Sequence, residues 1–433
     1  MSGKDVRSET ERDGLWRRLW RSRSGNLSVL FGLSILPAVL LLGGTADYML
    51  LIEAREQLNS AADAAALASV SRNSMSLSTS NAQTLATKVF DAHLASTKVA
   101  GYVKTKTPAV SEANLLRSAT YTYVAEVPMS FLGLAGINKV TIDGTSKASS
   151  SMPVYMDFYL LLDNTPSMGV AATTAGINTM VANTPDRCAF ACHDTSAYPN
   201  DYYGLAKKLG VSTRIDVMRS ATQQLMDTAT SSQLVSSQFR MAIYTFGAAA
   251  QTRSLTTISS LTSNLASAKT AASAIDLMTV PYQNYDSDMH TDFDGILTSM
   301  NTTIPNPGSG STASSPQKVL FFVSDGVADA NYTTTCTRPL YANYRCQEPL
   351  TVAKCTAIKN RGIKIAVLYT TYLPLPTNSW YMDWIAPFSP QIATNMQACA
   401  SPGLYFEVSP SGGIADAMNA LFKKAIQTAR LTG

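Results

Sequence analysis

The sequence predicts an α/β protein with a transmembrane helix near its N-terminus and a doubly wound sheet domain in its C-terminal part. Residues 27–46 form an uncharged, mostly apolar run, residues 101–153 are rich in β-branched and aromatic residues, and from residue 154 on short apolar runs alternate with helical stretches. Continuous apolar runs are typical of strands in a parallel sheet that is buried on both faces. The 433 residues suffice for several domains, and the predicted parts are a basic tail (1–24), a transmembrane helix (25–50), a helical stalk (51–100), a small β-rich unit (101–153) and an α/β domain (154–433).

The composition describes a folded protein without a nucleic-acid partner. Hydrophobic residues make up 45% of the chain and charged residues 15%, which excludes an intrinsically disordered chain. The formal net charge is only +4, and no basic stripe with interleaved aromatic residues occurs. The motifs GxSxG and HExxH and a P-loop lysine are absent. We therefore expect a protein that binds partners and is not an enzyme.

The run LSVLFGLSILPAVLLLGGTA, at residues 27–46, is long enough to span a bilayer. The preceding LWRRLWRSRSG combines arginines, which mark the cytoplasmic side of a span, with tryptophans, which favour the membrane interface. We expect a single-pass protein with a cytoplasmic tail, an inner-membrane span and an exported bulk. A cleaved signal peptide is the alternative, but the apolar run exceeds the usual length and helical sequence continues past it.

Beyond the span, DYMLLIEAREQLNSAADAAALASVS contains no glycine or proline and favours an unbroken helix. A Ser/Asn-rich break precedes a second predicted helix over residues 82–97, with Asn81 as its N-cap. The alternating segments ATYTYVAEV and KVTIDGTSKASS then predict a small antiparallel β unit. A long helix that carries such a unit is similar in outline to pilin-like proteins.

From residue 154 onward, strands and helices are predicted in alternation. The strands are MDFYLLLD, FRMAIYTFG, KVLFFVSDG, IKIAVLYTTY and GLYFEVS. The helices are RIDVMRSATQQLMDTA, TSNLASAKTAASAIDLM, FDGILTSMN, PLTVAKCTAIKNRG and IADAMNALFKKAIQTARL. In such α/β folds, ligands bind beyond the carboxyl ends of the strands. Two of the strands end there in an aspartate, Asp163 and Asp325.

The segment DNTPSMG follows the first of these strands and carries oxygen ligands at every second position. Its Asp163, Thr165 and Ser167 are spaced so that their oxygens converge on one hard cation. An Asx/Pro turn with an incidentally exposed aspartate is the competing interpretation. The missing ligands of a cation site would come from other loops.

Together with a threonine in MHTDFDGIL and an aspartate in FFVSDG, this segment resembles the von Willebrand factor A domain. The resemblance implies a Rossmann-type domain with a metal-ion-dependent adhesion site formed by Asp163, Thr165, Ser167, Thr291 and Asp325. Thr165 stands where that family usually has serine, and it keeps the hydroxyl group. The implied ion is Mg²⁺, Ca²⁺ or Mn²⁺, and the implied partner supplies a carboxylate to the ion.

The membrane segment carries a second resemblance. Ser24-Gly25-Asn26, Asp47-Tyr48 and the alanine-rich stretch from Leu58 to Ala68 are similar to the start of TadE/TadG-like proteins of the Flp (tight-adherence) pilus system. This start combined with a von Willebrand A domain is similar to the larger members of that family. The resemblance implies a bacterial inner-membrane protein with a periplasmic bulk that acts in pilus assembly or anchoring. The alternatives are a stand-alone surface adhesin, a hydrolase that uses a metal at Asp163 and Asp325, and a redox protein that uses Cys188 and Cys192.

All six cysteines follow the predicted span, and their even number is typical of a disulfide-forming compartment. Local order suggests the pairs Cys188–Cys192, Cys336–Cys346 and Cys355–Cys399, although sequence alone does not determine the pairing. The segment CAFACH differs in spacing from a haem-attachment motif and lacks the ligand set of a zinc site, so we interpret it as a small disulfide loop. The acidic residues Asp286, Asp288, Asp292 and Asp294 near Thr291 are interpreted as solvated loop acids, and a second calcium site is the alternative.

Overall fold

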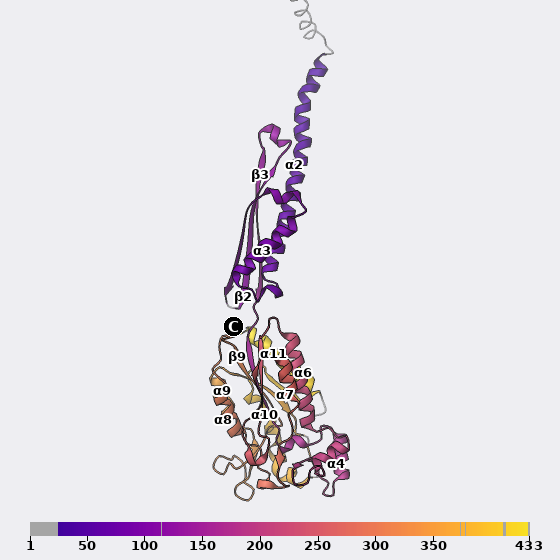
Figure 1. Cartoon of the computed structure of the whole chain (residues 1–433), viewed down its shortest axis with the longest axis vertical. Helices are drawn as coiled ribbons and strands as arrows, with labels where there is room; N and C mark the ends of the chain where they lie inside the picture. The colour runs from indigo at the N-terminus through magenta and orange to yellow at the C-terminus, as the bar shows by residue number, and fades with distance from the viewer. Residues whose placement is uncertain (1–24, 114, 373, 377, 410–412, 432–433) are drawn as a thin grey trace, which may run out of the picture. The chain divides into compact units, whose positions relative to one another are not determined.

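The computed structural model describes residues 25–431 except 114, 373, 377 and 410–412, and it divides into two compact units, Met1–Ser151 and Met152–Gly433 (Figure 1). The predicted basic tail at residues 1–24 lies outside the described residues. The mixed α/β class with an N-terminal apolar helix is confirmed.

The first unit begins with α2 (Gly25–Ser69), which among the described residues is the one helix long and apolar enough to cross a membrane. Its first half exposes large apolar side chains, whereas Ala54, Leu58 and Ala61 in its second half are completely buried. After η1 (Arg72–Ser74), α3 (Thr79–Leu94) packs back along α2. The predicted N-cap of this helix was wrong: the hydroxyl oxygen of Ser78, three residues earlier, accepts the backbone N–H of Asn81 at 3.2 Å.

The remainder of this unit is an antiparallel sheet in the order β1-β2-β3, connected to the helices through η2 (Lys98–Tyr102). The strands are β1 (Val103–Ala113), β2 (Leu116–Pro128) and β3 (Lys139–Ser151), and η3 (Leu132–Ala135) lies in the connection between the last two. Alternate residues of β2 are buried against α2 and α3, as the period of two requires. Within this core the rings of Phe90 and Tyr121 stack at 4.8 Å.

The second unit is built on a six-stranded sheet in the order β13-β12-β9-β4-β6-β7. All neighbouring strands are parallel except β6 and β7, which are antiparallel at one edge. The strands are β4 (Met156–Leu162), β6 (Phe239–Thr245), β7 (Thr256–Thr262), β9 (Gln317–Ser324), β12 (Lys364–Thr370) and β13 (Tyr405–Val408). A doubly wound sheet was predicted without a strand order; the structure places β9 and β4 at its centre, and β7 was not predicted.

Helices cover both faces of this sheet (Figure 1). On one face lie α8 (Phe293–Thr303), α9 (Val352–Asn360) and α10 (Ser389–Cys399). On the other face lie α6 (Arg214–Ser232), α7 (Leu265–Ala272) and α11 (Ile414–Leu431). Phe422 of α11 packs on Phe158 and Phe239 at ring separations of 4.8 and 5.5 Å.

Shorter elements connect these layers and gather largely beyond the carboxyl ends of the strands. They are η4 (Pro166–Gly169), α4 (Thr174–Asn183), β5 (His193–Asp194), α5 (Tyr202–Lys208), η5 (Ala250–Thr252), β8 (Thr279–Val280), η6 (Tyr285–Asp288), β10 (Val327–Ala330), β11 (Cys346–Pro349), η7 (Tyr381–Ile385) and η8 (Ala386–Phe388). Disulfides join Cys336 to Cys346 and Cys355 to Cys399. The third suggested pair is not formed, because Cys188 and Cys192 are free thiols. Cys188 instead lies near a backbone carbonyl, that of Phe190, at 3.7 Å.

Candidate metal centre

The two strand-ending aspartates lie side by side because their strands are neighbours. Strands β4 and β9 pair in parallel up to Leu162 and Val323, and the backbone N–H of Asp163 donates to the carbonyl oxygen of Val323 at 3.0 Å. Asp163 and Asp325 are both completely buried. The paired strands therefore bring two carboxylates to one point at the carboxyl edge of the sheet.

The hydroxyl groups of the DNTPSMG segment turn toward the first carboxylate. Asp163 Oδ1 accepts the backbone N–H of Thr165 at 3.0 Å and its hydroxyl at 2.7 Å. Asp163 Oδ2 accepts the hydroxyl of Ser324 at 2.6 Å. The hydroxyls of Thr165 and Ser167 lie 3.4 Å apart. The Asp163 carboxylate, the two hydroxyls of the segment and the Ser324 hydroxyl of β9 thus gather next to Asp325.

The sequence analysis missed a cation at this point, Arg214. Its side chain is 1% exposed, and its guanidinium donates to Asp325 Oδ2 at 3.1 Å. Arg214 is the first residue of α6. From the sequence alone, an arginine at this position is expected to face the solvent. The available signal was the preceding Thr213, which with Asp216 forms a capping box and so marks where the helix begins.

One guanidinium faces two buried carboxylates, so the negative charge of the carboxylates is incompletely compensated. Burial, and then the charge of Asp163, raise the pKa of Asp325 to about 6, against the lowering effects of Arg214, of the Ser167 hydroxyl and of the Val327 backbone. Burial likewise raises the pKa of Asp163, although Ser324 and Thr165 hydrogen-bond to it. Among the residues that the structure describes, none forms a hydrogen bond with the buried Asp325 Oδ1 that meets the usual distance and angle limits. An unpartnered carboxylate oxygen in such a place is costly unless a cation or a donor meets it.

Thr291, the fourth predicted ligand, is held by its backbone on an adjacent loop. Its N–H donates to the carbonyl oxygen of Asp329 at 2.9 Å, and the N–H of Asp329 donates back at 3.0 Å. Thr291 and Ser167 line the same cavity of about 510 Å³. Within the described part of the chain, no hydrogen bond joins Thr291 to the other four predicted ligands.

Asn164 anchors the segment from behind. Its side-chain amide donates to the carbonyl oxygens of Gly247 at 2.7 Å and Asp276 at 3.1 Å, and its side-chain oxygen accepts the N–H of Phe246 at 3.0 Å. The carbonyl oxygen of Asn164 also accepts the N–H of Met278 at 2.7 Å. The end of β4 is therefore tied to the end of β6 and to the connection that follows α7.

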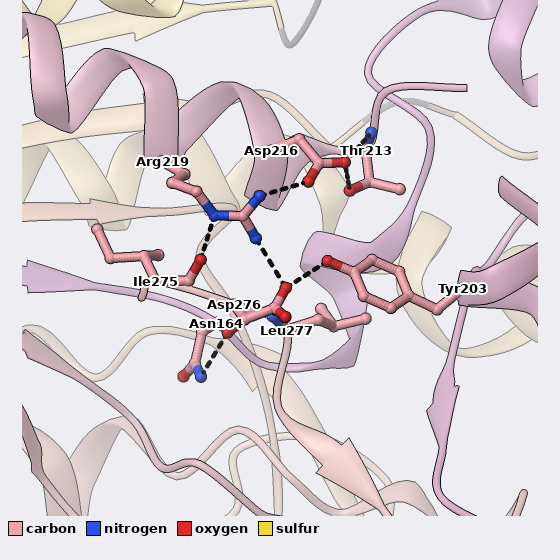
Figure 2. Close-up of polar contacts among 8 residues, drawn as sticks. All are labelled: Asn164, Tyr203, Thr213, Asp216, Arg219, Ile275, Asp276 and Leu277. Carbon is pink, nitrogen blue, oxygen red and sulfur yellow. Dashed lines mark hydrogen bonds and ion pairs between the residues drawn. The ribbon is translucent and has the colours of Figure 1, made fainter. Parts of the chain in front are cut away.

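A second layer of charged groups links this anchor to the start of α6, as Figure 2 shows. Arg219 donates to Asp276 at 2.7 Å and to Asp216 at 2.9 Å, and it also hydrogen-bonds the carbonyl oxygen of Ile275. Tyr203 donates its hydroxyl to the same Asp276 carboxylate. Asp216 in turn accepts the hydroxyl of Thr213 at 2.7 Å. The residue before Arg214 and the loop of Asp163 thereby belong to one connected network.

Aromatic and basic side chains line the wall of the cavity. Trp380 and Tyr341 meet edge to face at 4.8 Å, and the guanidinium of Arg345 lies 4.4 Å from the Trp380 ring centre. Arg345 also pairs with Asp329, whose pKa burial raises to about 6 even though Arg345 and Gln347 lower it. The cavity therefore presents rings and a cation to whatever enters it.

The four loop acids near Thr291 all have partners, and the side chains of Asp286 and Asp288 are also well exposed, at 39% and 45%. Asp286 pairs with Arg253 at 2.7 Å, Asp288 with Arg345 at 3.9 Å and Asp294 with Lys354 at 3.9 Å. Asp292 caps α8 by accepting the N–H of Gly295 at 2.9 Å, and it accepts the Tyr332 hydroxyl at 2.6 Å.

The donor set fits a hard divalent cation. Carboxylate and hydroxyl oxygens are the ligands that Mg²⁺, Ca²⁺ and Mn²⁺ prefer, and the unpartnered Asp325 Oδ1 offers a free lone pair beside them. Cys188 and Cys192 line the same cavity, but burial raises the pKa of the Cys192 thiol to about 12. Cys192 is therefore a neutral thiol at physiological pH, which disfavours a thiolate-based redox site.

Comparison with known proteins concerns both units. The family model described as "Putative Flp pilus-assembly TadE/G-like" matches residues 25–72. The N-terminal segment is TadE/G-like. This match covers the whole of α2 and includes the quoted Asp47-Tyr48 pair and the alanine-rich stretch. No curated protein matches the chain at a significant level.

Solved pilus proteins are similar to the chain at low identity. The vWF domain of the type V pili tip protein Mfa5 from Porphyromonas gingivalis aligns with 65% of this chain and 97% of its own, at 12% identity and a TM-score of 0.37. The PilB minor pilin from Streptococcus sanguinis aligns with 76% of this chain and 78% of its own, at 10% identity and a TM-score of 0.33. At these scores the fold rests on the strand order described above, and the TadE/G-like match rests on residues 25–72 alone.

Proposed function

We propose that this chain is a membrane-anchored envelope protein that acts in the assembly or anchoring of Flp-type pili and that binds protein partners through a divalent cation in its second unit. The TadE/G-like segment supports the pilus role, and α2 supports the anchor. The inferred orientation has the tail at residues 1–24 in the cytoplasm, the apolar run of α2 in the membrane, and the rest of both units in the periplasm. The inferred partners are other pilus-assembly or envelope proteins.

The observation that carries the cation proposal is the incomplete compensation of two buried carboxylates. Asp163 and Asp325 are completely buried, Arg214 reaches only Asp325 Oδ2, and Asp325 Oδ1 has no partner. Asp163, Thr165, Ser167, Thr291 and Asp325 would hold the ion. The bound ion would supply a positive charge that attracts an acidic side chain of the partner.

Arg214 also supports a second candidate, a metal-free scaffold. A guanidinium that lies 3.1 Å from Asp325 is itself a permanent counter-ion, and it would make the binding of a divalent ion unnecessary. In that case the lined cavity with Trp380, Tyr341 and Arg345 would bind the partner without a metal.

Calorimetry on the full chain in detergent separates the two candidates. Mg²⁺, Ca²⁺ and Mn²⁺ are titrated into the parent, into Asp163→Ala and Asp325→Asn, and into the control Asp227→Asn, whose carboxylate is exposed on α6. The cation site is supported if the parent and the control both release or absorb heat on binding the ion and the two site variants do not. A folded parent that takes up none of the three ions overturns it in favour of the scaffold.

The partner step is tested by capturing envelope and pilus proteins on the immobilised chain with and without chelator. Chelator-sensitive capture that Asp163→Ala also abolishes supports ion-bridged binding. Capture that is indifferent to chelator and to Asp163→Ala would contradict ion-bridged binding and leave the pilus role intact.

A further inference from the structure

The connection between β2 and β3 is mostly apolar. Residues 129–138, MSFLGLAGIN, contain no charged side chain, and we call them the 129–138 loop. Leu134 is 67% exposed and Ile137 48% exposed, although both are large apolar residues. Exposed apolar residues that gather on one loop mark an interaction surface more often than scattered ones do.

Contacts with α2 hold this loop in place. The carboxylate of Asp47, which is itself buried, accepts three successive backbone N–H groups of the loop: those of Ser130 at 3.1 Å, Phe131 at 2.8 Å and Leu132 at 2.7 Å. Gly43 leaves the room that the loop needs, because a Cβ atom there would lie 2.2 Å from the Phe131 ring. Figure 1 shows the end of the β2–β3 hairpin beside α2.

These contacts place the loop at the end of the apolar run of α2. Gly43 belongs to the uncharged run 27–46, and Asp47 follows it directly. At ~1.5 Å per residue, the two positions differ by only ~6 Å along the helix axis. The loop therefore lies level with the last turn of the predicted span, where a bilayer ends and its headgroups begin.

The neighbouring residues suit a membrane interface. Tyr48, next to Asp47 on α2, is 61% exposed, and tyrosine is enriched where headgroups meet acyl chains. Lys139 follows the loop directly and is also largely exposed, although it pairs with Glu126 at 2.8 Å. A lysine at this level extends its charge toward the headgroups while its methylene groups remain in apolar surroundings.

We propose that the 129–138 loop inserts Leu134 and Ile137 into the bilayer at the leaflet where α2 leaves it. The occupant of this apolar surface is the lipid itself, because the surface continues the lipid-facing side of α2 and carries no charge that would select a protein partner. The first unit then contacts the membrane at two points, the span and the loop. Asp47 stabilises the arrangement, since its charge is satisfied by the loop backbone and never meets the acyl chains.

Two contacts of this unit limit how it can move on the membrane. A helix alone allows rotation about its axis and tilting, whereas a second insertion point opposes both. The inserted loop therefore sets one orientation of the β1-β2-β3 sheet with respect to the membrane plane. This inference depends on the span of α2 and is independent of the cation site.

Depth-dependent quenching tests the proposal on the full chain in lipid vesicles. An environment-sensitive fluorophore is attached at Leu134→Cys, with Cys188 and Cys192 replaced by serine in every variant. Two matched positions serve as controls: Leu41→Cys within the apolar run, and Ser149→Cys on the exposed side of β3. Ser149 lies ten residues beyond Lys139, or ~33 Å along an extended strand.

Insertion predicts that a lipid-attached quencher reduces the emission at positions 134 and 41 at least twofold, and leaves position 149 unchanged. Iodide in the water phase should quench position 149 and spare position 134. If the lipid-attached quencher reduces the emission at position 41 but not at position 134, the insertion proposal is wrong. The membrane anchor then still stands. If lipid does not quench position 41 either, the span fails, and the insertion fails with it.

A charge substitution gives a second test, which uses the same label at position 134. Ile137→Asp in the loop should release the label at Leu134→Cys from lipid quenching, because a carboxylate disfavours the acyl region. The matched change Thr141→Asp, on the exposed side of β3 beyond the loop, should leave the quenching as it was. Equal effects of the two substitutions would contradict the proposal.

Discussion

The two ends of the six-stranded sheet treat buried carboxylates in opposite ways. At the amino end, Asp157 of β4 is completely buried and meets two cations, Arg240 at 2.7 Å through two bonds and Lys318 at 2.5 Å. At the carboxyl end, Asp163 and Asp325 share one guanidinium, and Asp325 Oδ1 has no partner. Strand β4 thus has the fully paired Asp157 as its second residue. Asp163, whose charge is incompletely compensated, follows its last residue.

The difference separates a carboxylate whose charge is fully paired from two carboxylates whose charge is not, and these two belong to the proposed cation site. Breaking a fully satisfied buried pair from one side is strongly destabilising, because it leaves an uncompensated buried charge. A carboxylate pair with too little positive charge costs stability, and a divalent cation would supply the missing charge. The following predictions alter each end in turn.

The largest effect is expected from Asp157→Ala. It leaves Lys318 and Arg240 next to each other without a counter-charge, and breaking a buried pair on one side costs about 3–5 kcal/mol. Urea unfolding followed by the fluorescence of Trp380 and Trp384 measures the loss. A cost no greater than that of the exposed control below would show that the amino end is not the stabilising one.

Arg214→Met tests the carboxyl end. In chelator, the variant buries two carboxylates without any counter-charge, and we expect a loss of about 3 kcal/mol. Saturating Mg²⁺ or Ca²⁺ should restore more stability to the variant than to the parent, because the ion then replaces the guanidinium. An ion at ~100 times its dissociation constant contributes about 2.7 kcal/mol. If divalent ions change the free energy of unfolding of neither protein, the proposed difference between the two ends of the sheet is contradicted.

Arg219→Met should have an intermediate effect. It removes the donor that joins Asp216 to Asp276 while the helix and the sheet remain, so we expect a loss of about 1–2 kcal/mol. The matched variant Tyr203→Phe removes only the hydroxyl that Tyr203 donates to Asp276 and should cost less. Divalent affinity measured on both variants would show whether this network positions the candidate centre; unchanged affinity in Arg219→Met would assign the network to stability alone.

Lys269→Met provides the low end of the scale. Lys269 pairs with Asp227 at 2.7 Å, but both side chains are well exposed, and such pairs contribute about 0–1 kcal/mol. In the same urea measurement, the free energy of unfolding of this variant should be almost the same as that of the parent. A loss comparable to that of Asp157→Ala would mean that burial does not decide the strength of ion pairs in this sheet.

The sequence predicted the parts of this fold that have a strong apolar signal. The runs around Phe158, Phe321 and Val367 are buried on both faces, so they are continuously apolar and visible as strands. The edge strand β7, TTISSLT, was not predicted, because it is partly exposed and rich in serine and threonine. α10 (SPQIATNMQAC) was also missed, although its buried residues Ile392, Met396 and Cys399 recur at helical spacing.

The candidate site was predictable where it depends on strand ends and unpredictable where it depends on tertiary contacts. Asp163 and Asp325 were placed together by the rule that parallel strands end at one edge. Arg214 was missed because only packing against the sheet brings the start of α6 to Asp325. Asn164 was missed for a related reason: its partners Gly247 and Asp276 are distant in the sequence. That the five predicted ligands hold a metal remains a prediction.

The central position of β4 has a mechanical consequence. The chain enters the second unit directly at this strand, and the candidate centre lies at the strand's other end. A partner bound there would load β4 along its length, against seven paired residues in β6 and seven in β9. Sliding β4 out would require the hydrogen bonds to both neighbours to break together and not one after another. Tension between the membrane and a bound partner would thus be carried in shear by the best-supported strand of the sheet.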